Sequence, residues 1–204
     1  ALDEARRAAR LQHPHLAPAI EVGEQERWPY IAYDAAGSTL DERKPTANGE
    51  ALLAARCVAE CASALAFAHD GGHAHNDLQP WLVTLSDSGS ARLMGLGLLP
   101  AQLPRAAEGS AESFEQHLRR GAREAAENDV LALAIVLHGV LAGAPALGEP
   151  DVGAALLRLA PAGREPIRLP WNVPRPIPEA LRAIVNRATD RQVRQRFRNA
   201  RTLA

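Results

Sequence analysis

The chain has 204 residues, of which 47% are hydrophobic, 23% charged and 4% aromatic, and its formal net charge is −1. These proportions exclude a disordered or collagen-like chain, and the length suffices for a core that needs no disulfide or metal. The charged N-terminus lacks the apolar region of a secretion signal, and we predict no membrane segment. Cys57 and Cys61 lie four residues apart on an expected helix, which favours a reducing cytoplasm over a disulfide.

The basic charge comes almost entirely from arginine and is concentrated near the C-terminus. Lys44 is the single lysine among 23 basic residues. Residues 151–204 carry 11 arginines against 4 acidic residues, a net charge of +7, whereas residues 1–150 have a net charge of −8. We expect a solvated helix face there, with a docking surface for an acidic partner as the alternative. Nucleic acid is not an expected partner, because Phe197 is the one stacking aromatic in the arginine run.

The N-terminal half combines short elements with one long helix, whose bounds follow from apolar spacing, prolines and glycine pairs. The predicted elements are a helix over Leu2–Leu11, strands over Ala17–Val22 and Trp28–Tyr33, a short helix from Gly37 to Asp41, and a long helix from Asn48 or Gly49 to Ala68.

The C-terminal half is mainly helical after one hairpin. The hairpin is indicated by two strand-like runs around the turn Ser86-Asp87-Ser88-Gly89. The predicted elements are strands over Trp81–Thr84 and Ala91–Met94, a loop with short helical pieces over residues 98–127, a buried helix over Val130–Leu141 capped by Asn128, and helices over Asp151–Leu159, Glu179–Thr189 and Phe197–Leu203.

One segment after the long helix carries a specific resemblance. The run His75-Asn76-Asp77-Leu78-Gln79-Pro80-Trp81-Leu82 resembles the catalytic loop of protein kinases, His-Arg-Asp-Leu-x-x-x-Asn. Other motifs resemble the family in the same order: Glu4 to Pro14 its αC helix, Pro29 to Leu40 its hinge, Leu93 to Gly97 its Asp-Phe-Gly segment, Ser113-Phe114-Glu115 its Ala-Pro-Glu motif, Asp129 the start of helix αF, and Arg196 the late arginine.

The resemblance covers nearly the whole chain and implies an α+β, protein-kinase-like fold. Residues 37–204 would form a mainly helical large lobe. Residues 1–36 would form a truncated small lobe of one αC-like helix and two strands. The glycine-rich loop and its lysine-bearing strand do not occur in this sequence, so Glu4 would lack its lysine partner.

The resemblance also implies that the catalytic machinery is incomplete. Asp77 stands at the position of the catalytic base, with His75 and Asn76 before it. Leu82 replaces the metal-binding Asn, and Gly95 replaces the metal-binding Asp. Neither residue has a side chain able to bind a hard cation. Asn76 replaces an arginine that reads a phosphorylated activation segment, and a neutral amide cannot do so bidentately.

Positions that support the scaffold are retained. Gly97 and Asp129 match structural residues of the large lobe, and Asp129 would anchor the catalytic-loop backbone. Glu115 and Arg196 match a buried ion pair that ties the activation segment to the last helices. A zinc cluster of His13, His15, His69, His73 and His75 is the minor alternative to ordinary packing roles for these histidines.

We therefore predict a pseudokinase, a non-catalytic regulatory or scaffolding module that needs no cofactor or metal. Its partner would be another protein, such as a kinase or a membrane-associated regulator, or a second copy of the chain, at an exposed apolar patch near Leu2, Ile20 and Ile31. The expected location is the cytoplasm, including the cytosolic part of a membrane-anchored protein. The alternative is a divergent active serine/threonine kinase that uses ATP and Mg²⁺ and whose glycine loop and lysine lie outside this chain.

Overall fold

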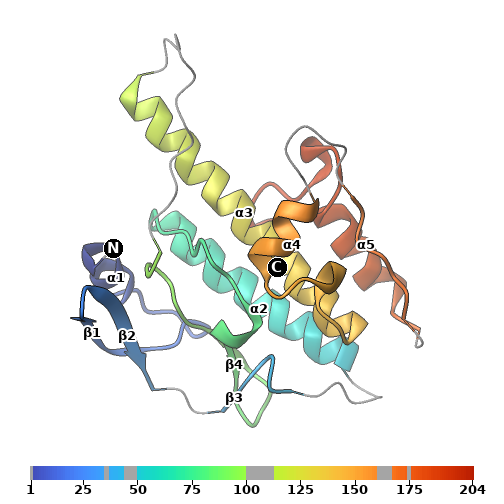
Figure 1. Ribbon diagram of the computed structural model, residues 1–204, viewed down its shortest axis with the longest axis horizontal. Helices are drawn as coiled ribbons and strands as arrows, with labels where there is room; N and C mark the ends of the chain where they lie inside the picture. Colours follow the sequence, from blue (N-terminus) through green and yellow to red (C-terminus); the bar gives the residue numbers. More distant parts are fainter. Residues whose placement is uncertain (1, 35–36, 44–49, 100–112, 160–166, 174–175) are drawn as a thin grey trace.

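The computed structural model describes residues 2–34, 37–43, 50–99, 113–159, 167–173 and 176–204. Their elements form a helical body with a small helix-and-hairpin unit at one end (Figure 1). The predicted α+β class is confirmed. The predicted division between residues 1–36 and 37–204 falls beside residues 35–36, outside the described residues, and stays a prediction.

The small unit consists of α1 (Leu2–Ala8) and a two-stranded antiparallel sheet of β1 (Ala19–Gln25) and β2 (Trp28–Tyr33). The strand β1 extends three residues beyond the prediction because the hairpin turns at Glu26 and Arg27, whose φ angles are 51° and 72°. Two positive φ angles give the turn type whose twist matches that of paired strands.

The predicted apolar patch on this unit is present only in part. Ile20 is 70% exposed, and Trp28, at the other end of the two-stranded sheet, is 78% exposed. Leu2 and Ile31 are partly buried instead. The exposed apolar surface is therefore centred on the two strands.

A second sheet joins the small unit to the body. It has the order β3–β4–β5, with β3 (Ser38–Thr39), β4 (Val83–Leu85) and β5 (Ala91–Leu93) all antiparallel. The chain before β1 pairs with β5, because the Ala17 N–H donates to the Leu93 carbonyl over 2.9 Å.

Two predictions for this region are wrong. The segment from Gly37 to Asp41 is not a helix, since Gly37 has φ +117° and a Cβ there would lie 2.1 Å from the Leu85 carbonyl oxygen. That close approach and the positive φ fit only glycine and place Ser38 against β4. The first predicted hairpin strand begins two residues late, because the short 3₁₀ helix η1 (Pro80–Leu82) precedes β4.

The core lies between α2 (Glu50–Asp70) and α3 (Phe114–Ala142), which cross in the middle of the body (Figure 1). By length and composition alone both helices could also cross a membrane. Their buried faces instead pack in the core, where Cys61 and Leu65 of α2 are fully buried and Leu137 of α3 is 1% exposed.

The N-terminal half of α3 was missed as a helix. Residues 114–127 lack apolar periodicity, but ion pairs at i,i+4 link Glu115 to Arg119, Arg120 to Glu124 and Arg123 to Glu127. Ser113 also forms a capping box with Gln116. A helix that is polar all round can be stabilised by such pairs and caps, and here it projects beyond the body (Figure 1).

The C-terminal part is made of short helices. The prediction holds to within a residue or two for α4 (Val152–Leu159) and α5 (Glu179–Ala188). Three 3₁₀ turns complete it: η2 (Ala146–Gly148), η3 (Val193–Gln195) and η4 (Ala200–Thr202). The predicted helix over Phe197–Leu203 is therefore a single turn, which begins at Asn199 because its side chain accepts from the Thr202 N–H.

Candidate active site

Asp129 organises the segment that resembles the catalytic loop. It is 1% exposed on α3, and its Oδ2 accepts from the backbone N–H of His75 over 2.7 Å. Its Oδ1 accepts from the Asn76 N–H over 2.9 Å, and His69 Nε2 donates to Oδ2 over 2.8 Å. A buried carboxylate with three charge-assisted hydrogen bonds fixes the backbone just before Asp77.

His75 and Asn76 connect this loop to the segment that follows β5. The buried ring of His75 donates from Nε2 to the Met94 carbonyl over 2.7 Å. Asn76 has φ +67°, a left-handed conformation that Asn tolerates better than most residues. Its side-chain amide donates to the Leu99 carbonyl over 3.1 Å.

Asp77 is partly buried and is held by a residue that the sequence reasoning missed. Gln79 donates from Nε2 to Asp77 Oδ1 over 2.7 Å, and its Oε1 accepts from the Val152 N–H over 3.0 Å. Gln79 is 3% exposed, so it links the candidate base to the start of α4 from a buried position. No local pattern in the sequence signals a contact across 73 residues.

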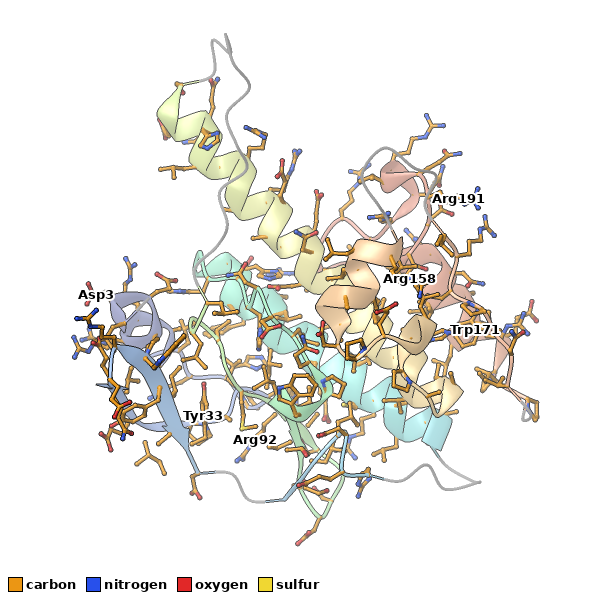
Figure 2. All side chains as sticks on the ribbon, viewed as in Figure 1. Asp3, Tyr33, Arg92, Arg158, Trp171 and Arg191 are labelled. Atoms are coloured by element: carbon orange, nitrogen blue, oxygen red, sulfur yellow. The ribbon has the colours of Figure 1, made fainter. Side chains whose placement is uncertain are left out.

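Leu82 and Gly95, where the resemblance places the metal ligands of kinases, lie next to each other. A Cβ on Gly95 would lie 3.2 and 3.3 Å from the two methyl carbons of Leu82, and Gly95 has φ +85°. The backbone N–H of Gly95 donates to the Tyr33 hydroxyl over 2.8 Å (Figure 2 labels Tyr33 at the end of β2). Burial raises the pKa of Tyr33, and the Gly95 hydrogen bond opposes part of that effect.

This donor set does not fit the Mg²⁺ that the resemblance implies. Mg²⁺ needs oxygen ligands in near-octahedral arrangement, usually one or two carboxylates together with phosphate oxygens. Leu82 offers only carbon atoms, Gly95 has no side chain, and Tyr33 presents a neutral phenol that already accepts a hydrogen bond. Asp77 is the one catalytic-loop carboxylate that remains.

Glu4 and Gly97 join α1 to the large lobe. Glu4 Oε1 bonds His73 Nδ1 over 2.6 Å, and Glu4 Oε2 accepts from Arg7 over 2.6 Å, so its carboxylate pairs with groups other than a lysine. Gly97 has φ +80°, and a Cβ there would lie 2.7 Å from the Ala8 Cβ. Only glycine permits α1 to approach this closely.

The predicted buried ion pair between Glu115 and Arg196 is wrong. Glu115 lies in the first turn of the projecting part of α3, where its side chain is 73% exposed and bonds Arg119. Arg196 instead donates from Nε to the Asp190 carbonyl over 2.7 Å. The continuous helix α3 directs Glu115 outward, which the prediction of a loop over 98–127 did not anticipate.

The histidines go to separate partners. His69 bonds Asp129, His73 bonds Glu4 and His75 bonds the Met94 carbonyl, while His13 and His15 contact each other with ring centroids 5.6 Å apart. Within the described ranges, no three His, Cys, Asp or Glu side chains are arranged to hold a metal ion. The packing interpretation of the histidines is the one that fits these contacts.

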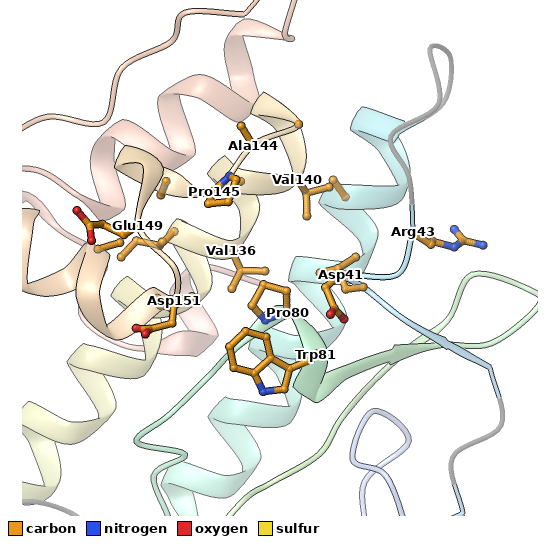
Figure 3. Close-up of a pocket in the computed structure, with 18 of the residues that line it drawn as sticks. Asp41, Arg43, Pro80, Trp81, Val136, Val140, Ala144, Pro145, Glu149 and Asp151 are labelled. Carbon is orange, nitrogen blue, oxygen red and sulfur yellow. The ribbon is translucent and has the colours of Figure 1, made fainter.

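A mainly apolar cavity of about 630 Å³ adjoins the catalytic-loop segment through Pro80 and Trp81. Val136 of α3 lies beside these two rings, and Asp41 and Asp151 lie on opposite sides of the cavity (Figure 3). Trp81 is 44% exposed. The lining also contains Arg43 and Glu149, so charged groups of both signs accompany its apolar side chains.

Comparison with curated proteins places the chain among bacterial kinases. It is 30% identical, over 95% of its length, to a probable serine/threonine-protein kinase PknB of Lactococcus lactis and covers 32% of that protein. It is 29% identical, over 97% of its length, to the serine/threonine-protein kinase PrkC of Bacillus subtilis and covers 31% of it. PknB of Mycobacterium leprae is 30% identical over 74% of the chain.

The chain thus spans about a third of the length of these relatives. No family model matches it. The fold is kinase-like, with a helical large lobe and a small lobe reduced, among the described residues, to α1, β1 and β2. From the ordered motifs, the fold and these similarities together, the chain belongs to the protein kinase superfamily.

Proposed function

We propose that this chain is a pseudokinase, a non-catalytic module that regulates or scaffolds other proteins through a kinase-shaped surface. The observation that carries the proposal is the juxtaposition of Leu82 and Gly95. It puts aliphatic carbon and a bare backbone at the two positions where catalysis would need oxygen ligands for Mg²⁺. The anchoring of the loop by Asp129 is kept although these ligands are absent.

The proposal includes partner and location. The chain would work in the cytoplasm without ATP or Mg²⁺ and would bind another protein, such as a kinase or a membrane-associated regulator, or a second copy of itself. Exposed apolar side chains support a protein partner, since Ile20 at one end of the small sheet and Trp28 at the other are both exposed. The two cysteines are free and buried, which accords with a reducing compartment.

The alternative is a divergent active serine/threonine kinase. The relatives carry that description, and Asp77 stays partly accessible with a hydrogen bond that orients it. This alternative requires a glycine loop, a lysine and a replacement metal ligand, all supplied from outside the described residues. The active-kinase alternative therefore depends on several groups outside the described residues, whereas the pseudokinase proposal depends on none.

A phosphotransfer assay on the full natural protein decides between the two. The protein is incubated with γ-labelled ATP and Mg²⁺ or Mn²⁺, with casein as a general acceptor, beside its Asp77→Asn variant. We expect equal background labelling for both proteins. Transfer that depends on Asp77 would overturn the pseudokinase proposal and favour the enzyme.

A further inference from the structure

A polar hollow of about 690 Å³ lies between α5 and the segment that follows it. In Figure 1, α5 is on the opposite side of the molecule from α1, β1 and β2. The same edge carries Trp171 and Arg191 in Figure 2. The charged residues that line the hollow are five arginines and one aspartate: Arg168, Arg187, Arg194, Arg196, Arg198 and Asp190.

Neutral acceptors hold the inner guanidinium groups. Arg196 Nε donates to the Asp190 main-chain carbonyl over 2.7 Å, and Arg187 Nε donates to the Gln195 carbonyl over 3.4 Å. Such contacts orient a guanidinium without cancelling its charge. Partial burial lowers the pKa of Arg196, although Asp190 and Glu127 attract its charge and oppose that effect.

The positive charges of the outer arginines have still fewer polar partners. Arg194 Nε donates to the amide oxygen of Gln192 over 3.1 Å. Arg168 and Arg198 have no hydrogen-bond or ion-pair partner among the residues that the structure describes. Elsewhere, exposed arginines such as Arg119 and Arg158 do pair with carboxylates. The hollow thus gathers five arginines around one lining carboxylate, that of Asp190.

Two aromatic rings contact side chains of the hollow from outside its lining, and both already have partners. The guanidinium of Arg187 lies 4.5 Å from the centre of the Phe197 ring and covers one face of it. The Trp171 ring packs on His138 with centroids 4.7 Å apart, and its Nε1 donates to Asn186. Among the described residues that line the hollow, none offers an aromatic ring on which the bases of a nucleic acid could stack.

We propose that this arginine hollow binds phosphorylated side chains of a protein partner. A phosphoserine or phosphothreonine brings a charge of about −1.5 to −2 and three strong acceptor oxygens on one small group. The planar guanidinium fork matches phosphate oxygens bidentately, and five arginines line one recess here. Because the hollow is separate from Leu82 and Gly95, the inference goes beyond the proposed function and holds whether or not Asp77 is catalytic.

The test is a binding titration with defined probes. Fluorescence anisotropy of the full protein is measured with a labelled Gly-Ala peptide that carries two phosphoserines. The same peptide with two serines, the same peptide with two glutamates, and a single-stranded oligonucleotide serve as comparisons. We expect the phosphopeptide to bind at least about tenfold more tightly than the serine peptide, since even one charge-assisted hydrogen bond is worth that factor.

Matched variants separate the hollow from general charge attraction. Arg168→Gln with Arg198→Gln removes two unpaired cations of the hollow, and Arg119→Gln with Arg158→Gln removes the same charge elsewhere. Binding should fall about tenfold or more in the first variant and less than about threefold in the second. Equal losses in both variants, tighter binding of the oligonucleotide than of the phosphopeptide, or no phosphopeptide binding would each overturn the proposal.

Discussion

Replacing Asp129 should destabilise the fold far more than replacing an exposed carboxylate. The side chain is 1% exposed and receives hydrogen bonds from the His75 N–H, the Asn76 N–H and His69 Nε2 over 2.7 to 2.9 Å. In Asp129→Ala the two backbone N–H groups lose their acceptors. Each buried unpaired group costs about 1–3 kcal/mol, and breaking a buried charged network costs about 3–5 kcal/mol.

We therefore expect a loss of about 3–5 kcal/mol of unfolding free energy, a large share of the roughly 5–15 kcal/mol that holds a domain folded. Urea denaturation followed by circular dichroism measures it, and with a slope of about 2–3 kcal/mol per molar the midpoint should fall by about 1–2.5 M. Asp70→Ala is the control, because Asp70 pairs with Arg201 at the surface and should cost no more than about 1 kcal/mol. A loss in Asp129→Ala no larger than that of the control would refute the anchoring role.

Three further predictions follow from individual contacts. Gly97→Ala should lower the unfolding free energy by about 2–4 kcal/mol in urea denaturation, because the new Cβ would clash with α1 at a residue of φ +80°. Gly72→Ala is the control: it has the same φ, its Cβ would meet no atom within 4 Å, and it should cost about 1 kcal/mol. Similar losses in the two variants would contradict the close approach of α1 to Gly97. Tyr33→Phe leaves the buried Gly95 N–H unpaired and should lower the unfolding free energy by about 1–3 kcal/mol, so an unchanged midpoint would show that this bond is not formed. Burial lowers the pKa of His138 below its usual value, so its contribution to stability is present above about pH 6.5 and is lost as the pH falls. Stability measured from about pH 7 to pH 5 should therefore decline less steeply in His138→Gln than in the natural protein, and equal slopes would contradict this assignment.

The region around the candidate site shows which contacts could be predicted. Apolar spacing and capping residues placed α2, α4 and α5 to within about two residues. The link from Asp129 to the His75–Asn76 backbone spans more than 50 residues and came only from the resemblance to kinases. Local pattern cannot supply such a contact, because two segments far apart meet through the packing of α2 on α3.

The errors have identifiable physical causes. The polar start of α3 was read as a loop, although Ser113 with Gln116 and the four-residue spacing of Glu115 and Arg119 were visible signals of a capped, ion-paired helix. The wrong pairing of Glu115 with Arg196 came from the resemblance of Ser113-Phe114-Glu115 to the Ala-Pro-Glu motif, whereas the helix holds Glu115 at the surface beside Arg119. The sequence carries no signal for the role of Gln79, because one of its partners is the backbone N–H of Val152, 73 residues away along the chain.

The arginine-rich C-terminal segment was expected to be a solvated helix face. The structure divides it: Arg201 lies at the surface with Asp70, whereas five other arginines surround one hollow. Composition predicted the excess of charge but not its convergence. The gathering of arginines depends on the path of the chain after α5, where η4 stands in place of the helix expected over Phe197–Leu203 and η3 precedes it.

The central claim is that this kinase-like site cannot seat a divalent cation beside ATP. Thermal unfolding of the full protein with saturating ATP, in Mg²⁺ or in EDTA, tests it most directly. A ligand present at about 100 times its dissociation constant adds roughly 2.7 kcal/mol, which would raise the melting temperature by about 5–11 °C at this chain length. We predict the same melting temperature in Mg²⁺ and EDTA for the natural protein, with a Mg²⁺-dependent rise only in the variant Leu82→Asn with Gly95→Asp. A Mg²⁺-dependent rise of several degrees in the natural protein would contradict the account.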